Sequence, residues 1–314
     1  MTTLSGTEFN EKYSNTEFYK VLNQDGIHFG FTYQHGLNID RIPFNPSGIC
    51  LMGGLYFTEL NKVSYWIGPN SVYIAKVTIP LNATVYVEEY KFKADQFVLD
   101  LDNKVLIKDF HMWENEEFCK IAVSQADTYN LVFVRNQSDE ICKLAVKHDY
   151  RALQYVINQT EDICKTAISN HAYALEFVKD KTDDICKLAL SKHGYGLEFV
   201  KVQTYELCKL ALSKNGRALQ YVLLQTDELC KLAVSQNGFA LEFVKTQTDE
   251  LCTLAVSQTA HALKYVRNQT DEICKLAVSQ NPFALEYVKV QTTELCQLAI
   301  SHNDGDTFAF YIPT

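Results

Sequence analysis

The chain has 314 residues, of which 47% are hydrophobic, a composition typical of a folded protein with a core and not of a disordered one. Its formal net charge is −9 and its pI is about 5.4. An acidic chain gains little from the release of counterions on a phosphate backbone, which argues against nucleic acid as a partner. The N-terminus lacks the basic and apolar segments of a secretory signal, and no apolar run approaches the ~20 residues that span a bilayer. We therefore expect an intracellular protein that is not inserted in a membrane.

Residues 1–110 have short apolar runs rich in β-branched and aromatic residues, separated by Pro and Gly. These runs predict strands, and the Asn45–Gly48 and Gly53-Gly54 segments predict turns. We expect a compact β-rich or α+β domain here. The predicted strands are Gly26–Tyr33, Gly54–Leu60, Tyr73–Pro80, Thr84–Phe92 and Gln96–Leu101.

The remainder of the chain repeats every 22 residues. The units Thr226–Gln247, Thr248–Gln269 and Thr270–Gln291 are nearly identical, and earlier units begin at Ser138, Thr160, Thr182 and Thr204. A looser unit, about Glu114–Gln137, precedes them, and the half unit Thr292–Asn303 ends the array. Such periodicity predicts an all-α solenoid of helix-turn-helix units over residues 111–303, followed by a capping tail at 304–314.

Each unit predicts two short helices. Thr or Ser at position 1 is a helix N-cap, and the acids that follow suit the positive end of the helix dipole. Lysines at position 6, such as Lys143, Lys187 and Lys231, predict weak pairs with an acid three residues earlier. A second cap is expected at Asn215, Asn237 or Asn281, and at His171 or His193. The second helix then places Ala, Leu, an aromatic residue and Val against its neighbours.

Nine of the ten cysteines, Cys119 to Cys296, recur with this repeat, whereas Cys50 stands alone. Equivalent positions in packed helices lie about 8–10 Å apart, whereas a disulfide needs Cα atoms within about 7 Å. Without a Cys-x-x-Cys pair or a His-Glu-x-x-His motif, no metal site is expected. We interpret these cysteines as small buried residues in a reducing compartment.

One position differs between otherwise similar units, and we call its residues the variable stripe. Aromatic residues and Arg are enriched among interface anchors, so this position predicts a binding surface. The alternative is that its aromatic members pack between units and its other members face water. The variable stripe comprises Arg151, Tyr173, Tyr195, Arg217, Phe239, His261 and Phe283.

Two resemblances add to this interpretation. The segment GLNIDRIPFNPSGICLMGGLYFTE (36–59), with YIAKVTIP (73–80) and KFKADQFVLD (91–100), resembles the N-terminal domain of many repeat proteins of the mimivirus group, where it often precedes ankyrin repeats. The 22-residue units are similar to a short helical-repeat family of giant viruses and some bacteria. This resemblance implies a viral protein acting in the host cytoplasm or in the virion.

A second resemblance is to ADP-ribosyltransferases of the poly(ADP-ribose) polymerase type. HGLNI, GGLYFTELNKVSYW, VTIP and KADQFVLD follow the order of that family's strands, which implies an NAD site formed by His28, Tyr56, Ser64 and Asp95. The sequence departs from the family at Asp95, where the family has Glu, and at His28, which lacks the following Gly. The pair His35-Gly36 is an alternative anchor but lies out of order. An inactive relic of that fold is a further alternative.

No phosphate-binding Gly-rich loop and no nucleophile elbow occurs in the sequence. The leading hypothesis is therefore an interaction scaffold that binds a protein partner, from the host or the virus, along the solenoid and needs no cofactor. The alternatives are an ADP-ribosyltransferase-like domain targeted by the solenoid, and a self-associating component of the virion or viral factory.

Overall fold

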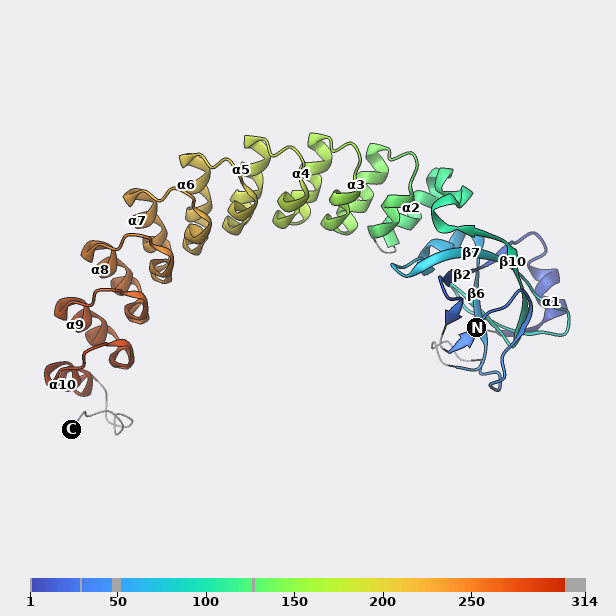
Figure 1. Cartoon of the computed structure of the whole chain (residues 1–314), viewed down its shortest axis with the longest axis horizontal. Helices are drawn as coiled ribbons and strands as arrows, with labels where there is room; N and C mark the ends of the chain where they lie inside the picture. The colour runs from blue at the N-terminus through green and yellow to red at the C-terminus, as the bar shows by residue number, and fades with distance from the viewer. Residues whose placement is uncertain (1, 29, 47–51, 126–127, 303–314) are drawn as a thin grey trace. The chain divides into compact units, whose positions relative to one another are not determined.

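The computed structural model describes residues 2–28, 30–46, 52–125 and 128–302 (Figure 1). The predicted capping tail and Cys50 lie outside this part of the chain. Contacts divide the chain into two compact units, Met1–Ile163 and Cys164–Thr314, so the division falls inside the repeat array. The predicted domain boundary at residue 110 stays a prediction, although the chain does change there from strands to helices.

The first compact unit contains an eight-stranded antiparallel sheet with the strand order β1-β8-β9-β6-β2-β7-β10-β5. Its centre, β2-β7-β10, joins the longest strands, and β10 has an irregular register between Asp100 and Val105. A separate short hairpin pairs β3 (Ile27–His28) with β4 (Phe31–Thr32). The sheet strands are β1 (Thr2–Ser5), β2 (Phe18–Asn23), β5 (Gly36–Ile39), β6 (Leu55–Glu59), β7 (Ser71–Thr78), β8 (Thr84–Val87), β9 (Phe92–Ala94) and β10 (Gln96–Leu106).

The β-rich prediction for the N-terminal part is confirmed, with differences in detail. The predicted strand 26–33 is only the β3–β4 hairpin, and the predicted strand 84–92 ends at Val87, with β9 beginning at Phe92. Strands β1, β2 and β5 and helix α1 (Gly6–Lys12) were not predicted. Helix α1 places Phe9 among the rings of Phe18, Phe57 and Phe92, at centroid distances of 5.0–5.9 Å, and these four rings form the centre of the core.

Buried side chains join the sheet to the first repeat. The Trp113 indole is 1% exposed, donates through Nε1 to the Ile107 carbonyl at 2.7 Å, and packs against Phe118 and Phe133. Asn130, in the 3₁₀ helix η4 (Thr128–Phe133), donates to the Ser64 carbonyl at 3.5 Å. Ser64 lies in η1 (Leu60–Trp66), next to the sheet. The sheet domain therefore covers the open end of the first repeat.

The 22-residue period is confirmed, but the second helix of each repeat is a 3₁₀ helix of one and a half to two turns, a form used in short pieces. Within each compact unit, Figure 1 shows the α-helices of the repeats following one another at regular intervals. They are α2 (Glu116–Gln125), α3 (Asp139–His148), α4 (Glu161–Asn170), α5 (Asp183–Lys192), α6 (Tyr205–Lys214), α7 (Asp227–Gln236), α8 (Asp249–Gln258), α9 (Asp271–Gln280) and α10 (Thr293–Ser301). The 3₁₀ helices that follow α3 to α9 are η5 (Tyr150–Tyr155), η6 (Ala172–Phe177), η7 (Gly194–Phe199), η8 (Gly216–Tyr221), η9 (Gly238–Phe243), η10 (Ala260–Tyr265) and η11 (Pro282–Tyr287).

The predicted caps are present at most positions. The position-1 hydroxyl, as in Thr226, accepts from the amide three residues later. Asn215, Asn237, Asn281 and His171 accept from the amide two residues later and cap the 3₁₀ helices. The prediction for His193 is wrong, because its side chain makes no such bond.

Two of the lysines that were expected to pair within their own helix, Lys143 and Lys231, pair with an acid of the next repeat instead. Lys143 pairs with Asp162, Lys231 with Glu250 at 2.8 Å and Lys275 with Glu294 at 2.8 Å. Each acid lies in the first turn of the next α-helix along the chain. Because the pairs are exposed to solvent, they add little to the stability of the array.

Cysteines 119 to 296 of the repeats are free and buried, as expected from their spacing. Burial raises the pKa of Cys119 and Cys142 to about 11, which keeps both thiols protonated and unreactive at neutral pH. The Cys230 thiol lies 3.7 Å from Oε1 of Gln225, the residue that ends the preceding repeat.

This final glutamine joins consecutive repeats. Gln225 donates through Nε2 to the Phe243 carbonyl at 2.9 Å and accepts at Oε1 from the Lys245 amide at 2.9 Å. Both partners belong to the next repeat, so the side chain of Gln225 connects two consecutive repeats by two hydrogen bonds. The same two bonds are made by Gln137, Gln203, Gln247 and Gln269.

One repeat departs from this arrangement. Residue 181 is a lysine, whose ammonium donates to the Val178 carbonyl at 2.6 Å within its own repeat. A lysine has no acceptor to offer to the amide of Lys201, the equivalent of Lys245. Burial also lowers the pKa of Lys181, which marks the cost of placing a charge at this position.

Replacing Lys181 with Gln is therefore expected to stabilise the protein. Two new hydrogen bonds and the removal of a half-buried charge raise the free energy of unfolding by roughly 1–2 kcal/mol. Urea unfolding followed by circular dichroism measures the change. Lys187→Gln is the control for loss of a lysine, since Lys187 lies exposed on α5. Equal stability of the two variants would contradict this role for the glutamine.

Candidate functional site

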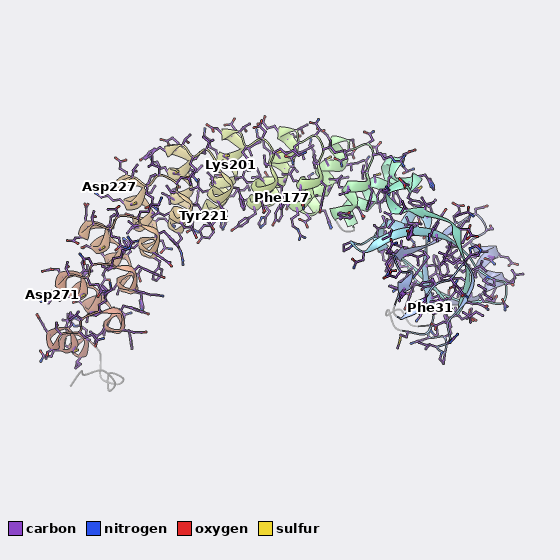
Figure 2. All side chains as sticks on the ribbon, viewed as in Figure 1. Phe31, Phe177, Lys201, Tyr221, Asp227 and Asp271 are labelled. Carbon is purple, nitrogen blue, oxygen red and sulfur yellow. The ribbon has the colours of Figure 1, made fainter. Side chains whose placement is uncertain are left out.

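The variable stripe lies on the 3₁₀ helices. Within residues 164–302, Figure 2 shows Phe177 and Tyr221, which end η6 and η8, on one edge of the row of repeats, and Asp227 and Asp271 on the opposite edge. Arg151, in the first compact unit, and Phe283, in the second, are exposed. The five residues between them, Tyr173, Tyr195, Arg217, Phe239 and His261, are half-buried.

The half-buried members contact the next repeat. Tyr173 packs edge-to-face on Phe199 at 6.1 Å, and Tyr195 packs on Tyr221 at 6.0 Å. Further along, Phe239 packs on Tyr265 at 6.2 Å, and His261 on Tyr287 at 5.7 Å. In each case the partner is the aromatic residue that ends the 3₁₀ helix of the next repeat. We call this series of contacts the ladder. In it, each of these four variable residues packs against the aromatic residue that ends the next 3₁₀ helix.

Arg217 makes the same contact with different chemistry. Its guanidinium lies 5.4 Å from the Phe243 ring, and Nη2 donates to the Glu242 carboxylate at 3.1 Å. An arginine and a tyrosine thus occupy equivalent places without a change of backbone. These side chains pack between repeats and also keep an exposed side. Their role in binding stays a prediction.

In five repeats a glycine or alanine precedes the variable residue, and it allows the next repeat to approach. These residues are Ala172, Gly194, Gly216, Gly238 and Ala260. A Cβ added to Gly216 would lie 2.2 Å from the Ala233 carbonyl oxygen of α7, and its amide donates to Gln236 at 2.6 Å. The 3₁₀ helix η8 thus packs closely against α7 of the next repeat, and a larger residue at position 216 would disturb this contact.

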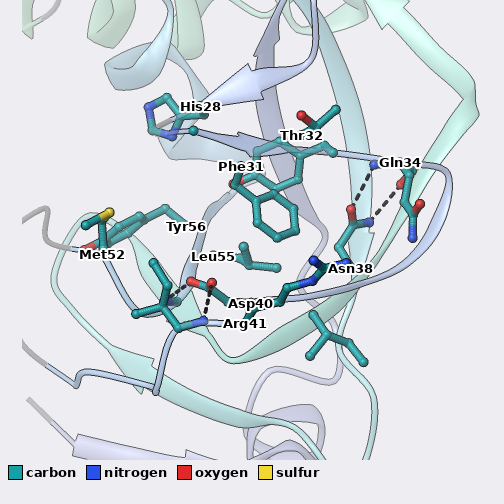
Figure 3. Close-up of a pocket in the computed structure, with 15 residues that line it drawn as sticks. His28, Phe31, Thr32, Gln34, Asn38, Asp40, Arg41, Met52, Leu55 and Tyr56 are labelled. Atoms are coloured by element: carbon teal, nitrogen blue, oxygen red, sulfur yellow. Dashed lines mark hydrogen bonds between the residues drawn. The ribbon is translucent and has the colours of Figure 1, made fainter.

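The candidate catalytic residues are only partly brought together. His28 and Tyr56 line the same two neighbouring cavities beside β6, one of about 480 Å³ and one of about 230 Å³ (Figure 3). Loss of solvent around the imidazole and the nearby Lys20 ammonium lower the pKa of His28 to about 4, so the ring is neutral at pH 7.

Ser64 and Asp95 do not join them. The Ser64 side chain is 1% exposed in η1, and Asp95 caps a strand turn, where Oδ1 accepts from the Thr84 amide at 2.8 Å. Neither residue lines the two cavities that contain Tyr56. The geometry therefore gives no support to the transferase constellation, and NAD binding stays an untested prediction.

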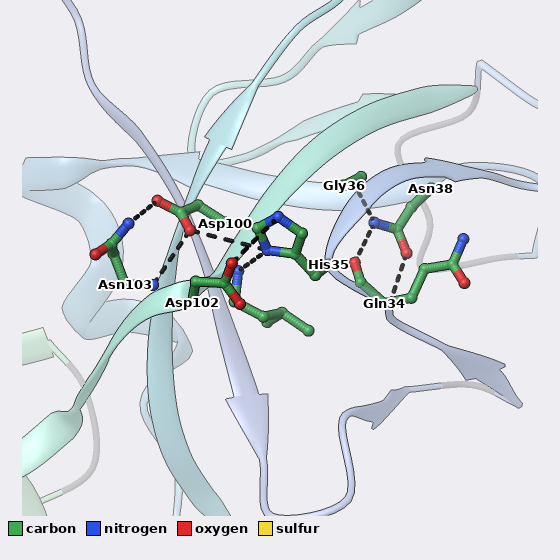
Figure 4. A network of polar contacts seen from close by, with 8 residues as sticks. Gln34, His35, Gly36, Asn38, Asp100, Asp102 and Asn103 are labelled. Carbon is green, nitrogen blue, oxygen red and sulfur yellow. Dashed lines mark hydrogen bonds and ion pairs between the residues drawn. The ribbon is translucent and has the colours of Figure 1, made fainter.

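The alternative anchor, His35, lies at the β5–β10 edge of the sheet (Figure 4). Its Nδ1 accepts from the Leu101 amide at 3.3 Å, and its Nε2 lies 3.5 Å from the Asp102 carboxylate. Asn38 fixes the loop before β5 by bonding both the amide and the carbonyl of Gln34. His35 thus holds a loop against β10 and does not line the Tyr56 cavities.

Sequence reasoning missed two sets of residues at these sites. The aromatic residues that end each 3₁₀ helix, such as Tyr221 and Phe243, form half of the ladder, but their constancy between repeats suggested only core packing. Lys20, Lys91 and Trp66 line the smaller cavity with Tyr56, and no local sequence signal indicates that they meet.

Comparison with known proteins finds one family model and several relatives. Residues 204–247 match the model of a domain of unknown function, DUF4116. The chain is 42% identical over 76 residues to ankyrin repeat protein R229 of Acanthamoeba polyphaga mimivirus, covering 22% of this chain and 24% of that protein. It is 31% identical over 81 residues to ankyrin repeat protein R868 of the same virus, covering 25% and 40%.

The chain is similar to giant-virus repeat proteins. The predicted resemblance to the mimivirus group is thereby confirmed, and a third mimivirus protein, the uncharacterised R869, is 26% identical over 102 residues, covering 31% of this chain and 72% of that protein. The chain spans about a quarter of R229 and two fifths of R868. No solved structure matches the chain. Among the described residues, no helix is both long and apolar enough to cross a bilayer, and no group of three metal-ligating side chains occurs.

A double-mutant cycle tests the ladder. Tyr195→Ala and Tyr221→Ala are each expected to lower the free energy of unfolding, with a coupling of about 0.5–1.5 kcal/mol, because their rings share one edge-to-face contact. Urea unfolding of the wild type, both single variants and the double variant measures the coupling. The control pair is Tyr195→Ala with Tyr265→Ala, whose effects should simply add. Additive effects for both pairs would show that the ladder contact contributes nothing.

Proposed function

We propose that this protein is an interaction scaffold that binds a protein partner along the variable stripe. The proposal rests on one observation, which is that the repeats differ at the variable stripe. Repeats that keep the same period and the same buried core change chemistry at one half-exposed position, from tyrosine to arginine, phenylalanine and histidine. A position that mattered only for packing would favour one residue type in identical surroundings.

The composition of this edge suits a protein partner. Aromatic residues and arginine supply much of the energy of protein interfaces, and rings already held by the next repeat lose little entropy on binding. The basic residues nearby are engaged with the array itself. Arg267 donates to the Lys245 and Val244 carbonyls, and Lys289 donates to the Arg267 carbonyl. This use of basic side chains, together with the net charge of −9, disfavours nucleic acid as the partner.

Two relatives support a viral setting for the proposal. R229 and R868 are described as ankyrin repeat proteins of a giant virus, and stacked repeats offer extended binding surfaces. We place this chain in the host cytoplasm or in the virion, with a host or viral protein as its partner. Self-association is the competing form of the same activity, and the mass of the protein in solution distinguishes the two.

The test replaces Tyr173, Tyr195, Arg217 and Phe239 together with Ala and captures partners from infected-host lysate with the full chain. Partners retained by the wild type are expected to be lost by this variant, because truncation of interface anchors typically costs about 1 kcal/mol or more each. Quantitative mass spectrometry measures the loss.

Two controls separate recognition from folding. A shuffled variant, Tyr173→Arg, Tyr195→Arg, Arg217→Tyr and Phe239→Arg, uses residue types that the same position already accommodates, so it keeps the ladder but changes the surface chemistry. It should fold and lose the same partners. Replacing the exposed acids Asp184, Glu206, Glu228 and Glu272 of the α-helices with Ala should leave capture unchanged. Unchanged capture by the alanine and shuffled variants would refute the proposal.

A further inference from the structure

The smaller cavity beside Tyr56 has an unusual wall. It has a volume of about 230 Å³ and is lined from β2 by Tyr19, Lys20 and Val21, from β3 by His28, from β6 by Tyr56, Phe57 and Thr58, and by Trp66 and Lys91. Two lysines and no carboxylate occur among these residues. The wall therefore combines aromatic surface with positive charge.

Its lysines are buried to a degree that charged side chains rarely reach. Lys20 is 6% exposed and Lys91 is 8% exposed, and the adjacent Lys93 is wholly buried. Removing an ammonium group from water costs several kcal/mol unless the surroundings compensate it. Around this cavity, part of the compensation comes from ring faces.

The Lys91 ammonium lies between two rings of the cavity wall, 4.6 Å from the centre of Tyr56 and 5.5 Å from that of Trp66. Lys93 approaches Tyr56 at 5.1 Å, and Lys20 approaches the Tyr33 ring at 4.8 Å. Each such contact stabilises the ammonium, because the face of an aromatic ring attracts a cation. Lys91 also pairs with the Glu88 carboxylate at 3.8 Å, but Glu88 does not line the cavity.

The larger neighbouring cavity differs in chemistry. Its lining mixes apolar side chains with polar groups, among them Gln34, Asn38 and the Asp40 carboxylate, which accepts from the Gly54 and Ile42 amides. Figure 3 shows Asp40 beside Arg41 in this cavity, with Tyr56 and His28 also in its wall. An anion would therefore favour the smaller, lysine-lined cavity.

We propose that the smaller cavity is a binding site for a small aryl anion, a planar ring carrying a phosphate or a carboxylate. The anionic group lies between Lys20 and Lys91, and the ring packs on Tyr19, Tyr56 and Trp66. Charge-assisted hydrogen bonds in a low-dielectric site are stronger than those at a surface, which makes the lysines the source of affinity and the rings the source of selectivity. The neutral His28 completes the wall without adding charge.

This site is separate from the variable stripe and does not depend on the scaffold function. It also differs from the transferase alternative, because its chemistry is cationic and uses neither Ser64 nor Asp95. The N-terminal domain thus acquires a function of its own, the recognition of a small molecule, beyond covering the end of the repeats.

The test titrates the full chain with phenyl phosphate and with benzoate, and follows Trp66 fluorescence, since Trp66 lies in the wall and the other tryptophan, Trp113, is buried against the first repeat. Saturable binding of either anion supports the site, and the tighter of the two identifies the preferred group. Inorganic phosphate and phenol, which lack the ring and the charge respectively, should each bind at least tenfold more weakly. Two results with the wild-type protein would refute the proposal. One is that inorganic phosphate or phenol binds as tightly as both aryl anions, and the other is that neither aryl anion binds.

Variants locate the binding. Lys20→Gln and Lys91→Gln are each expected to weaken the binding of the preferred anion about tenfold or more, and Trp66→Phe should abolish the fluorescence signal while calorimetry still detects binding. Lys104→Gln is the matched control, because Lys104 also lies over a tyrosine ring, that of Tyr73 at 4.4 Å, but on an exposed stretch of β10. Full affinity in both folded lysine variants would overturn the assignment.

Discussion

The glutamine that ends each repeat is the interaction on which the array depends. A repeat of 22 residues forms one α-helix of about ten residues and one 3₁₀ helix of six, and neither length is stable alone in water. Apolar contact between layers supplies attraction but little direction. Gln225 adds direction, because its amide bonds the Phe243 carbonyl and the Lys245 amide of the next repeat in one geometry. Recurrence of this bond along the chain fixes the distance and rotation between successive repeats.

Because the glutamines, caps and core connect the repeats, the residue type in the variable stripe can change. The cores, caps and glutamines use backbone groups or buried apolar atoms that do not depend on the variable residue. The ring that ends the next 3₁₀ helix accepts an aromatic edge at Tyr195 and a guanidinium at Arg217 equally well, since both favour the electron-rich face of a ring. The residue type at this position can therefore change while the contact with the next repeat is kept, as the proposed scaffold function requires.

Much of the structure of the repeat array was predictable from the sequence. Less of the structure of the N-terminal part was predictable. Period, caps and buried cysteines follow from local patterns, because each signal lies within a single helix and its flanking residues. The glutamine bonds were not predictable, since they join groups in different repeats and a polar residue at the end of a repeat resembles an ordinary turn. Lys143 and Lys231 were assigned to partners on their own helices for the same reason. In the sheet domain, β1 and β2 lack clear flanking turns, and Lys20 and Lys91 meet at a cavity although they lie near opposite ends of the domain's sequence.

Native-state hydrogen exchange measured by NMR tests the central role of the glutamines most directly. The amides of Leu223, Lys245, Arg267 and Lys289 lie in exposed connections between helices but donate to a glutamine Oε1 of the preceding repeat. We expect these amides to be protected nearly as well as those of the α-helices, and the Lys201 amide, which faces Lys181, to exchange far faster. Equal and rapid exchange at all five amides would contradict the account, because the glutamines would then not hold the repeats together.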